Sequence, residues 1–268
     1  MRFRDFELIW SNWIELESKQ LSETIKNQPG IYKIKRTNQK SLDYVGQTNS
    51  LRHRLLSFRR HLFDKEMPWN DPHVAAARFW ALRQDEDFNL EVSVANISNG
   101  ELTRRAFECL TISQHRKEFH LSPTFNFGRM PNGWSASSQR RKGIRGSRNT
   151  TIKYSPHFKT LFSEKSDPLT PDWLGLEWRS FSKFPPTLTS KGVYRGFNKE
   201  NLIYIGESKK IKTRINSHIN KGIADNWDWV ELPDTDHAQR LEIENDLISS
   251  YILNAHELPK AQFNQDKN

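Results

Sequence analysis

The chain has 268 residues and a mass of 31.6 kDa, carries a formal net charge of +9 and contains one cysteine, Cys109. One cysteine excludes an internal disulfide framework, and because no run of about eighteen apolar residues occurs, we expect no membrane contact. The positive charge favours a polyanionic partner, and we expect a soluble, cytoplasmic protein.

The first half of the chain predicts short strands and helices in alternation. GIYKIK and DYVG each read as a strand, with a hairpin turn between them. Ser50 and its neighbours are helix N-cap types, so a helix should follow them. In chain order the expected elements are strands at 30–35 and 43–46, a helix from 51, an extra helix after Pro72, a strand at 88–97 and a long helix at 101–119.

The second half repeats this order. The expected elements are strands at 192–197 and 202–206, a helix from 211, a strand at 228–232 and a helix at 237–253. Tyr194 follows Tyr32 by 162 residues, and Tyr204 follows Tyr44 by 160. A nearly constant offset is the mark of a duplication. We therefore predict a first domain at 1–134, a basic linker at 135–151 and a second domain at 152–268.

Both halves carry Gly-(Ile/Val)-Tyr, then Tyr-(Val/Ile)-Gly, then a helical Arg, a Glu on a later helix and an Asn after a Pro. This order resembles the GIY-YIG nuclease superfamily over about residues 28–128 and 188–266. The resemblance implies two tandem α/β (α+β) domains, each a small mixed, mainly antiparallel sheet flanked by helices. It also implies two sets of site residues: Tyr32, Tyr44, Arg54, Glu108 and Asn126, and Tyr194, Tyr204, Arg214, Glu244 and Asn264.

These side chains suit phosphodiester hydrolysis. A guanidinium at Arg54 or Arg214 can hold phosphate oxygens in a planar fork. Glu108 and Glu244 are the expected ligands of Mg²⁺ or Mn²⁺, one ion per site, because Mg²⁺ accepts one protein carboxylate if water and phosphate complete its shell. No second carboxylate falls at a motif position, and no small-molecule cofactor is expected.

The resemblance also assigns roles to the remaining side chains. The first tyrosine of each set, Tyr32 or Tyr194, would activate water, while Tyr44 and Tyr204 would position phosphate or relay protons; spacing alone leaves open which tyrosine does which. Asn126 and Asn264 would support the sites through hydrogen bonds.

A histidine distinguishes the two halves. His218 lies four residues after Arg214, where many members of the superfamily have a histidine that would assist the base or contact phosphate. The first half has Phe58 at the equivalent place. The departure weakens only the histidine's role there, because other branches of the superfamily carry an aromatic residue at this position.

No Asp or Glu occurs from Phe119 to Ser163, so this stretch can lie against phosphates or form a solvated linker. Its candidate DNA-binding residues are Arg140, Arg141, Lys142, Arg145 and Arg148.

Two sites in one chain can cut both strands of a duplex, as a symmetric dimer does. We expect a monomeric pseudo-dimer that cuts double-stranded DNA at specific sites, as restriction enzymes do. The alternatives are a structure-specific repair or recombination nuclease, a phage-defence nuclease, and a DNA-binding module with an inactive site.

Overall fold

The computed structural model describes residues 8–70 and 73–263, and these residues form two compact units. The first unit contains the described residues up to His115 together with Ser122–Pro156. The second unit contains Arg116–Leu121 and the described residues from His157 onward. The predicted linker, 135–151, therefore packs as part of the first unit, and the division between the units falls after Pro156.

The first unit is built on a four-stranded sheet with the strand order β1-β4-β2-β3. All its strand pairings are antiparallel. Its elements are β1 (Ile14–Glu15), α1 (Gln20–Thr24), β2 (Gly30–Arg36), β3 (Tyr44–Thr48), α2 (Leu51–His61), α3 (Ala76–Arg83), β4 (Leu90–Asn96), α4 (Glu101–Phe119) and the 3₁₀ turns η2 (Asn126–Gly128) and η3 (Arg140–Lys142). The last residues of α4, from Arg116, cluster with the second unit.

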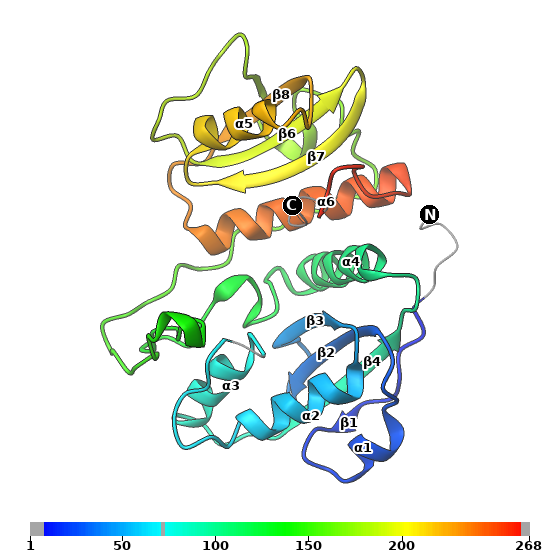
Figure 1. Ribbon diagram of the computed structural model, residues 1–268, viewed down its shortest axis with the longest axis vertical. Coiled ribbons are helices and arrows are strands. Elements are labelled where there is room, and N and C mark those ends of the chain that lie inside the picture. The colour runs from blue at the N-terminus through cyan, green and yellow to red at the C-terminus, as the bar shows by residue number, and fades with distance from the viewer. Residues whose placement is uncertain (1–7, 71–72, 264–268) are drawn as a thin grey trace. The chain divides into compact units, whose positions relative to one another are not determined.

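The second unit has the equivalent strand order, β5-β8-β6-β7, and its strands also pair antiparallel. Its elements are η4 (Trp173–Gly175), β5 (Arg179–Ser180), β6 (Gly192–Asn198), β7 (Asn201–Ser208), α5 (Ile211–Asn220), β8 (Asn226–Glu231) and α6 (His237–Ala255). Its sheet lies between α5 and α6, both of which contact β6 and β7 (Figure 1).

The predicted fold class is confirmed: the described residues form two four-stranded antiparallel sheets with six α-helices. The extra helix expected after Pro72 is α3. None of the described helices is long and apolar enough to cross a membrane.

The helices α2 and α5 show how the sequence positions a site. Each buries its first, fifth and eighth residues, which share one face at helical spacing. These residues are Leu51, Leu55 and Phe58 in α2, and Ile211, Ile215 and His218 in α5. The fourth residue of each helix is an arginine, Arg54 or Arg214, at the margin of the buried face. Anchoring the helix on the sheet thus fixes where its arginine points.

Candidate active site

Two tyrosines from neighbouring strands form the centre of the site in the first unit. Tyr32 on β2 and Tyr44 on β3 have ring centroids 6.1 Å apart. Burial raises the pKa of Tyr32 well above its ordinary value, and the neighbouring Tyr44 raises it further. Burial and the charge of Glu108 raise the pKa of Tyr44 to about 12. Both side chains are therefore protonated at neutral pH.

The glycine between these tyrosines in the sheet is required by their packing. A Cβ on Gly46 would lie 2.6 Å from the Tyr32 Oη and 2.7 Å from a ring carbon of Tyr44. In the second unit a Cβ on Gly206 would lie 2.5 Å from the Tyr194 Oη. Distances this short are not tolerated between non-bonded atoms, so the final Gly of each Tyr-(Val/Ile)-Gly motif makes room for the tyrosine pair.

A histidine that sequence reasoning missed completes the first site. His73, on the loop before α3, has its Nε2 3.0 Å from the Tyr32 Oη. Its ring packs on Phe58, with centroids 4.6 Å apart. Burial lowers the pKa of His73 well below its ordinary value, and Arg54 and Arg78 lower it further, so the ring is neutral.

Two arginines act electrostatically on the tyrosine pair. Arg54 lowers the pKa of both Tyr32 and Tyr44, although burial outweighs it. Arg78 on α3 also lowers the pKa of Tyr44, and its Nε donates to the Arg129 carbonyl at 2.9 Å. Arg78 belongs to the extra helix, so no motif identified it.

Glu108 on α4 adds one carboxylate to this group. The side chain is half-buried, and burial raises its pKa to about 7 although Arg105 opposes that shift. A carboxylate that loses hydration without full charge compensation is a good ligand for a hard cation.

The second unit assembles the equivalent residues. Tyr194 on β6 and Tyr204 on β7 stack with centroids 5.9 Å apart. The Nε of Arg214 donates to the Tyr194 Oη at 3.4 Å. Burial raises the pKa of both tyrosines, and the nearby charge of Glu244 raises them further.

His218 takes the same place here that His73 takes in the first unit. Its Nε2 lies 3.1 Å from the Tyr194 Oη, and its ring stacks on Trp227. Burial lowers the pKa of His218 to about 4, with smaller contributions from Arg214 and Lys221. The His218 Nδ1 is buried and has no hydrogen-bond partner among the residues that the structure describes.

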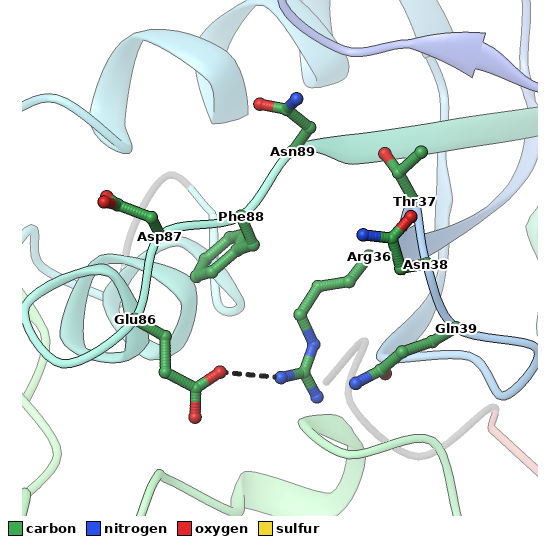
Figure 2. A pocket seen from close by; sticks show the side chains of 8 residues that line it. All are labelled: Arg36, Thr37, Asn38, Gln39, Glu86, Asp87, Phe88 and Asn89. Carbon is green, nitrogen blue, oxygen red and sulfur yellow. Dashed lines mark hydrogen bonds and ion pairs between the residues drawn. The ribbon is translucent and has the colours of Figure 1, made fainter.

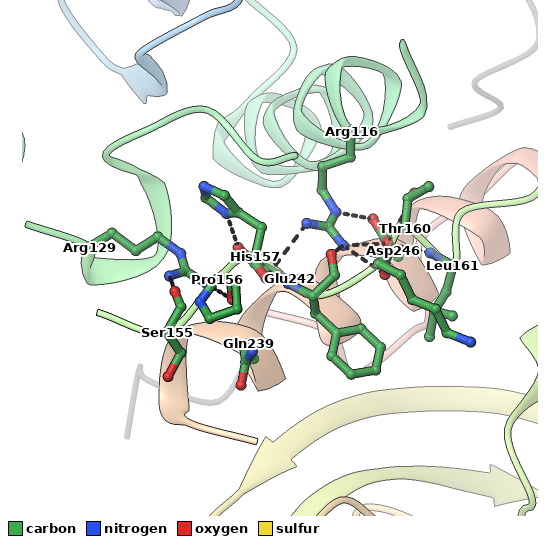
Figure 3. A network of polar contacts seen from close by, with 12 residues as sticks. Arg116, Arg129, Ser155, Pro156, His157, Thr160, Leu161, Gln239, Glu242 and Asp246 are labelled. Carbon is green, nitrogen blue, oxygen red and sulfur yellow. Dashed lines mark hydrogen bonds and ion pairs between the residues drawn. The ribbon is translucent and has the colours of Figure 1, made fainter. Parts of the chain in front are cut away.

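The acidic residues of α6 divide into two groups. The buried Glu242 and Asp246 belong to a network around Arg116, which contacts Asp246 through its Nε at 2.9 Å (Figure 3). Backbone N–H groups of Phe158 and Leu161 donate to the same carboxylates. This network holds the segment that contains Phe158 and Leu161 against α6, and its role is structural.

Glu244, also on α6, is half-buried and raises the pKa of the two tyrosines instead. Burial raises the pKa of Glu244 itself to about 8, with a further contribution from Glu207.

An amide side chain that follows each long helix, α4 or α6, hydrogen-bonds to the backbone of an edge strand, β3 or β7. Asn126 accepts from the Val45 N–H and donates to the Val45 carbonyl, both at 2.9 Å. In the second unit Gln262 accepts from the Ile205 N–H at 3.0 Å. Gln262 follows Glu244 by eighteen residues, as Asn126 follows Glu108, and both end a Pro-x-x segment. Asn264, the predicted counterpart, lies outside the described residues.

An arginine one turn before each glutamate contacts the residue after the motif glycine. The Nε of Arg104 donates to Gln47 at 3.3 Å, and that of Arg240 donates to Glu207 at 2.9 Å. Burial acts to raise the pKa of Glu207, but hydrogen bonds from His237 and Arg240 hold it below its ordinary value. Glu207 and Arg214 line a hollow of about 510 Å³ beside the second site.

The predicted DNA-binding residues are all exposed, and Arg145 and Arg148 form ion pairs within the first unit. Arg145 pairs with Glu66 at 3.1 Å, and Arg148 pairs with Asp85. Arg140, Arg141 and Lys142 form the turn η3.

A separate hollow of about 430 Å³ lies at the β2–β3 turn and contains none of the predicted site residues. Its arginine, Arg36, is paired with Glu86 at 3.0 Å (Figure 2). Arg36 is also paired with Asp43 at 3.1 Å. Because both carboxylates already neutralise this cation, the hollow offers little attraction for a phosphate.

Comparison with known families identifies the part of the second unit that contains Tyr194. Residues 190–251 match the model of the GIY-YIG catalytic domain. The match covers Tyr194, Tyr204, Arg214, His218 and Glu244. No match was found among curated proteins or among solved structures. The chain therefore contains a GIY-YIG catalytic domain, which is a nuclease domain acting on nucleic acid.

Proposed function

We propose that the protein is a magnesium-dependent endonuclease that cuts both strands of double-stranded DNA, with one catalytic site in each unit. The observation that carries this proposal is the recurrence of the Tyr-Tyr-Arg-Glu group on equivalent elements of both units, with a histidine within hydrogen-bond distance of the first tyrosine in each. We also propose that the first unit is a second GIY-YIG-like domain, produced by tandem duplication.

Details beyond the motifs support a duplication. The two long helices have 19 residues each, and a histidine with a left-handed φ of 57° follows each one, His120 and His256. The phenylalanine after each edge-holding amide also has a positive φ, 58° at Phe127 and 63° at Phe263. Left-handed backbone is uncommon for phenylalanine, so its recurrence at the same place in both units supports a shared origin.

The residues present fit one magnesium ion per site. No group of three or more His, Cys, Asp or Glu in the described part of the chain could form a metal cage. Glu108 and Glu244 would each supply one ligand, and water and substrate phosphate would supply the rest. When bound, the ion would polarise the phosphoryl group and stabilise developing negative charge.

The chain's own residues would orient the reaction. Arg54 and Arg214 would bind a non-bridging phosphate oxygen in each site. Tyr32 and Tyr194 would hold the attacking water by hydrogen bonding, because burial keeps their hydroxyls protonated until a nearby cation lowers their pKa. Arg141 and Lys142 would contact the DNA backbone outside the sites. We expect a monomer that acts in the cytoplasm.

Glutamate variants test this proposal on supercoiled plasmid with Mg²⁺. We expect the parent chain to produce linear DNA, and Glu108→Ala and Glu244→Ala each to produce nicked circles that are hardly linearised. The double variant, and the parent with EDTA, should leave the plasmid supercoiled. Glu86→Ala, an exposed glutamate of the first unit, is the matched control and should still linearise it. Full linearisation by either single variant would contradict one site per strand.

A further inference from the structure

The first unit lacks the helical histidine but has one from elsewhere at the same hydroxyl. Phe58 occupies the α2 position that His218 occupies in α5. His73 reaches Tyr32 from the loop before α3, with an Nε2–Oη distance of 3.0 Å, close to the 3.1 Å at His218 and Tyr194. A histidine ring in van der Waals contact with Phe58 thus replaces one on the helix itself.

Backbone geometry fixes which His73 nitrogen carries the proton. The Ala75 N–H donates to the His73 Nδ1 at 3.1 Å. A nitrogen that accepts a hydrogen bond carries no proton, so in the neutral ring the proton is on Nε2. His73 therefore donates to the Tyr32 oxygen. Among the described residues no group donates to or accepts from the Nδ1 of His218, so no such contact fixes its tautomer.

We propose that His73 is a positioning residue of the first site, fixed as a hydrogen-bond donor to Tyr32. An N–H aimed at the tyrosine oxygen directs the Tyr32 proton away from the ring and stabilises negative charge on that oxygen. The inference rests on the proposed nuclease function. It means that His73 supplies the imidazole that α2 lacks at the position of Phe58, so that the first site is active.

Two substitutions distinguish the contact of His73 with Tyr32 from its contact with the Ala75 N–H at the start of α3. His73→Asn keeps an acceptor for the Ala75 N–H but cannot reach Tyr32. His73→Gln places an amide N–H near Tyr32 but loses the short-range acceptor. Both are made in the Glu244→Ala chain, where only the first site cuts, and His53→Asn, an exposed position on α2, is the matched control.

We expect His73→Asn to lower plasmid nicking roughly 100-fold, as removal of one preorganised donor does, and His73→Gln to lower it less than about 10-fold because one donor is kept. Stability should follow the opposite order, because only Asn keeps an acceptor for the Ala75 N–H. If the Asn variant nicks as fast as the Gln variant, His73 only accepts the Ala75 N–H and the proposal is wrong.

An NMR spectrum of the histidine rings in the parent chain gives a test that does not depend on DNA cleavage. Two-bond proton–nitrogen correlations distinguish the neutral tautomers, and the His73→Gln variant identifies the signal. We expect the Nε2–H form, and the Nδ1–H form would overturn the proposal. A chain that never cuts DNA would remove the proposed function, while this spectrum would still decide whether His73 donates to Tyr32.

Discussion

The two candidate sites contain the same types of side chain but place some of them from different parts of the chain. In the second unit α5 supplies both Arg214 and His218. In the first unit α2 supplies Arg54, and the histidine comes from the loop before α3. An imidazole therefore lies at the hydroxyl of the first tyrosine in both units, although a different segment of the chain carries it in each.

The surroundings of the two sites differ in charge. The first unit has the neutral Gln47 after its motif glycine and an additional arginine, Arg78, near Tyr44. The second unit has Glu207 at the equivalent position, paired with Arg240. The two units therefore differ in the charged side chains beside the tyrosine pair: an additional arginine in the first unit and an arginine–glutamate pair in the second.

The motif glycines give the largest expected effect. Gly46→Ala places a methyl group 2.6 Å from the Tyr32 Oη, and Gly206→Ala places one 2.5 Å from the Tyr194 Oη. Overpacking of this kind lowers the free energy of unfolding by about 1–3 kcal/mol. Displacement of the tyrosine should also slow cutting by that unit about 100-fold, since misplacement of a catalytic group by about 1 Å has that effect.

Strand-specific nicking assays and urea denaturation measure both effects. Each alanine variant should slow only the strand that its own unit cuts, so each serves as the control for the other. Equal slowing of both strands by Gly46→Ala would show that the two sites do not act independently.

The fold and the centre of each site could be predicted from the sequence. Apolar residues at helical spacing anchor α2 and α5, and short β-rich runs with turns define the strands, so these local patterns place Tyr32, Tyr44 and Arg54 correctly relative to the sheet. Their recurrence after Gly192 predicted the second sheet. Local periodicity was sufficient because both the motifs and the elements that carry them are short-range features.

The missed residues depend on tertiary contacts. His73 precedes an extra helix, and nothing in its neighbours indicates that it reaches Tyr32, 41 residues earlier. Gln262 could have been found, because it repeats the spacing of Asn126 after Glu108, whereas the predicted Asn264 lies outside the described residues. The predicted linker at 135–151 is polar and basic, yet Arg145 and Arg148 pair with acidic residues of the first unit and hold it there.

The edge-strand amides provide the next test, with a smaller effect. Asn126 makes two hydrogen bonds to Val45, and Gln262 makes one to Ile205. Since each buried bond contributes about 1 kcal/mol, Asn126→Ala should lower the free energy of unfolding by about 2 kcal/mol and Gln262→Ala by about 1 kcal/mol. Urea titration measures both. A larger loss from Asn264→Ala than from Gln262→Ala would show that Asn264, as predicted from the sequence, is the supporting residue.

The smallest expected effect is the contribution of His218 to the pH dependence of the free energy of unfolding. Because burial lowers the pKa of the folded ring from 6.5 to about 4, the unfolded chain binds a proton more readily than the folded chain between these values. His218 therefore contributes stability above pH 6.5 that is lost as the pH falls toward 4.

Glu244 works in the opposite direction in part of this range. Its raised folded pKa, about 8, favours the folded chain at low pH, and this contribution is lost as the pH rises from 4.5 to 8. The parent curve alone therefore cannot isolate the histidine. The difference in unfolding free energy between the parent and His218→Gln, measured by urea at several pH values, removes the glutamate contribution. That difference should shrink as the pH falls from 6.5 to 4, and a difference that stays constant would show that His218 is not held neutral against Tyr194.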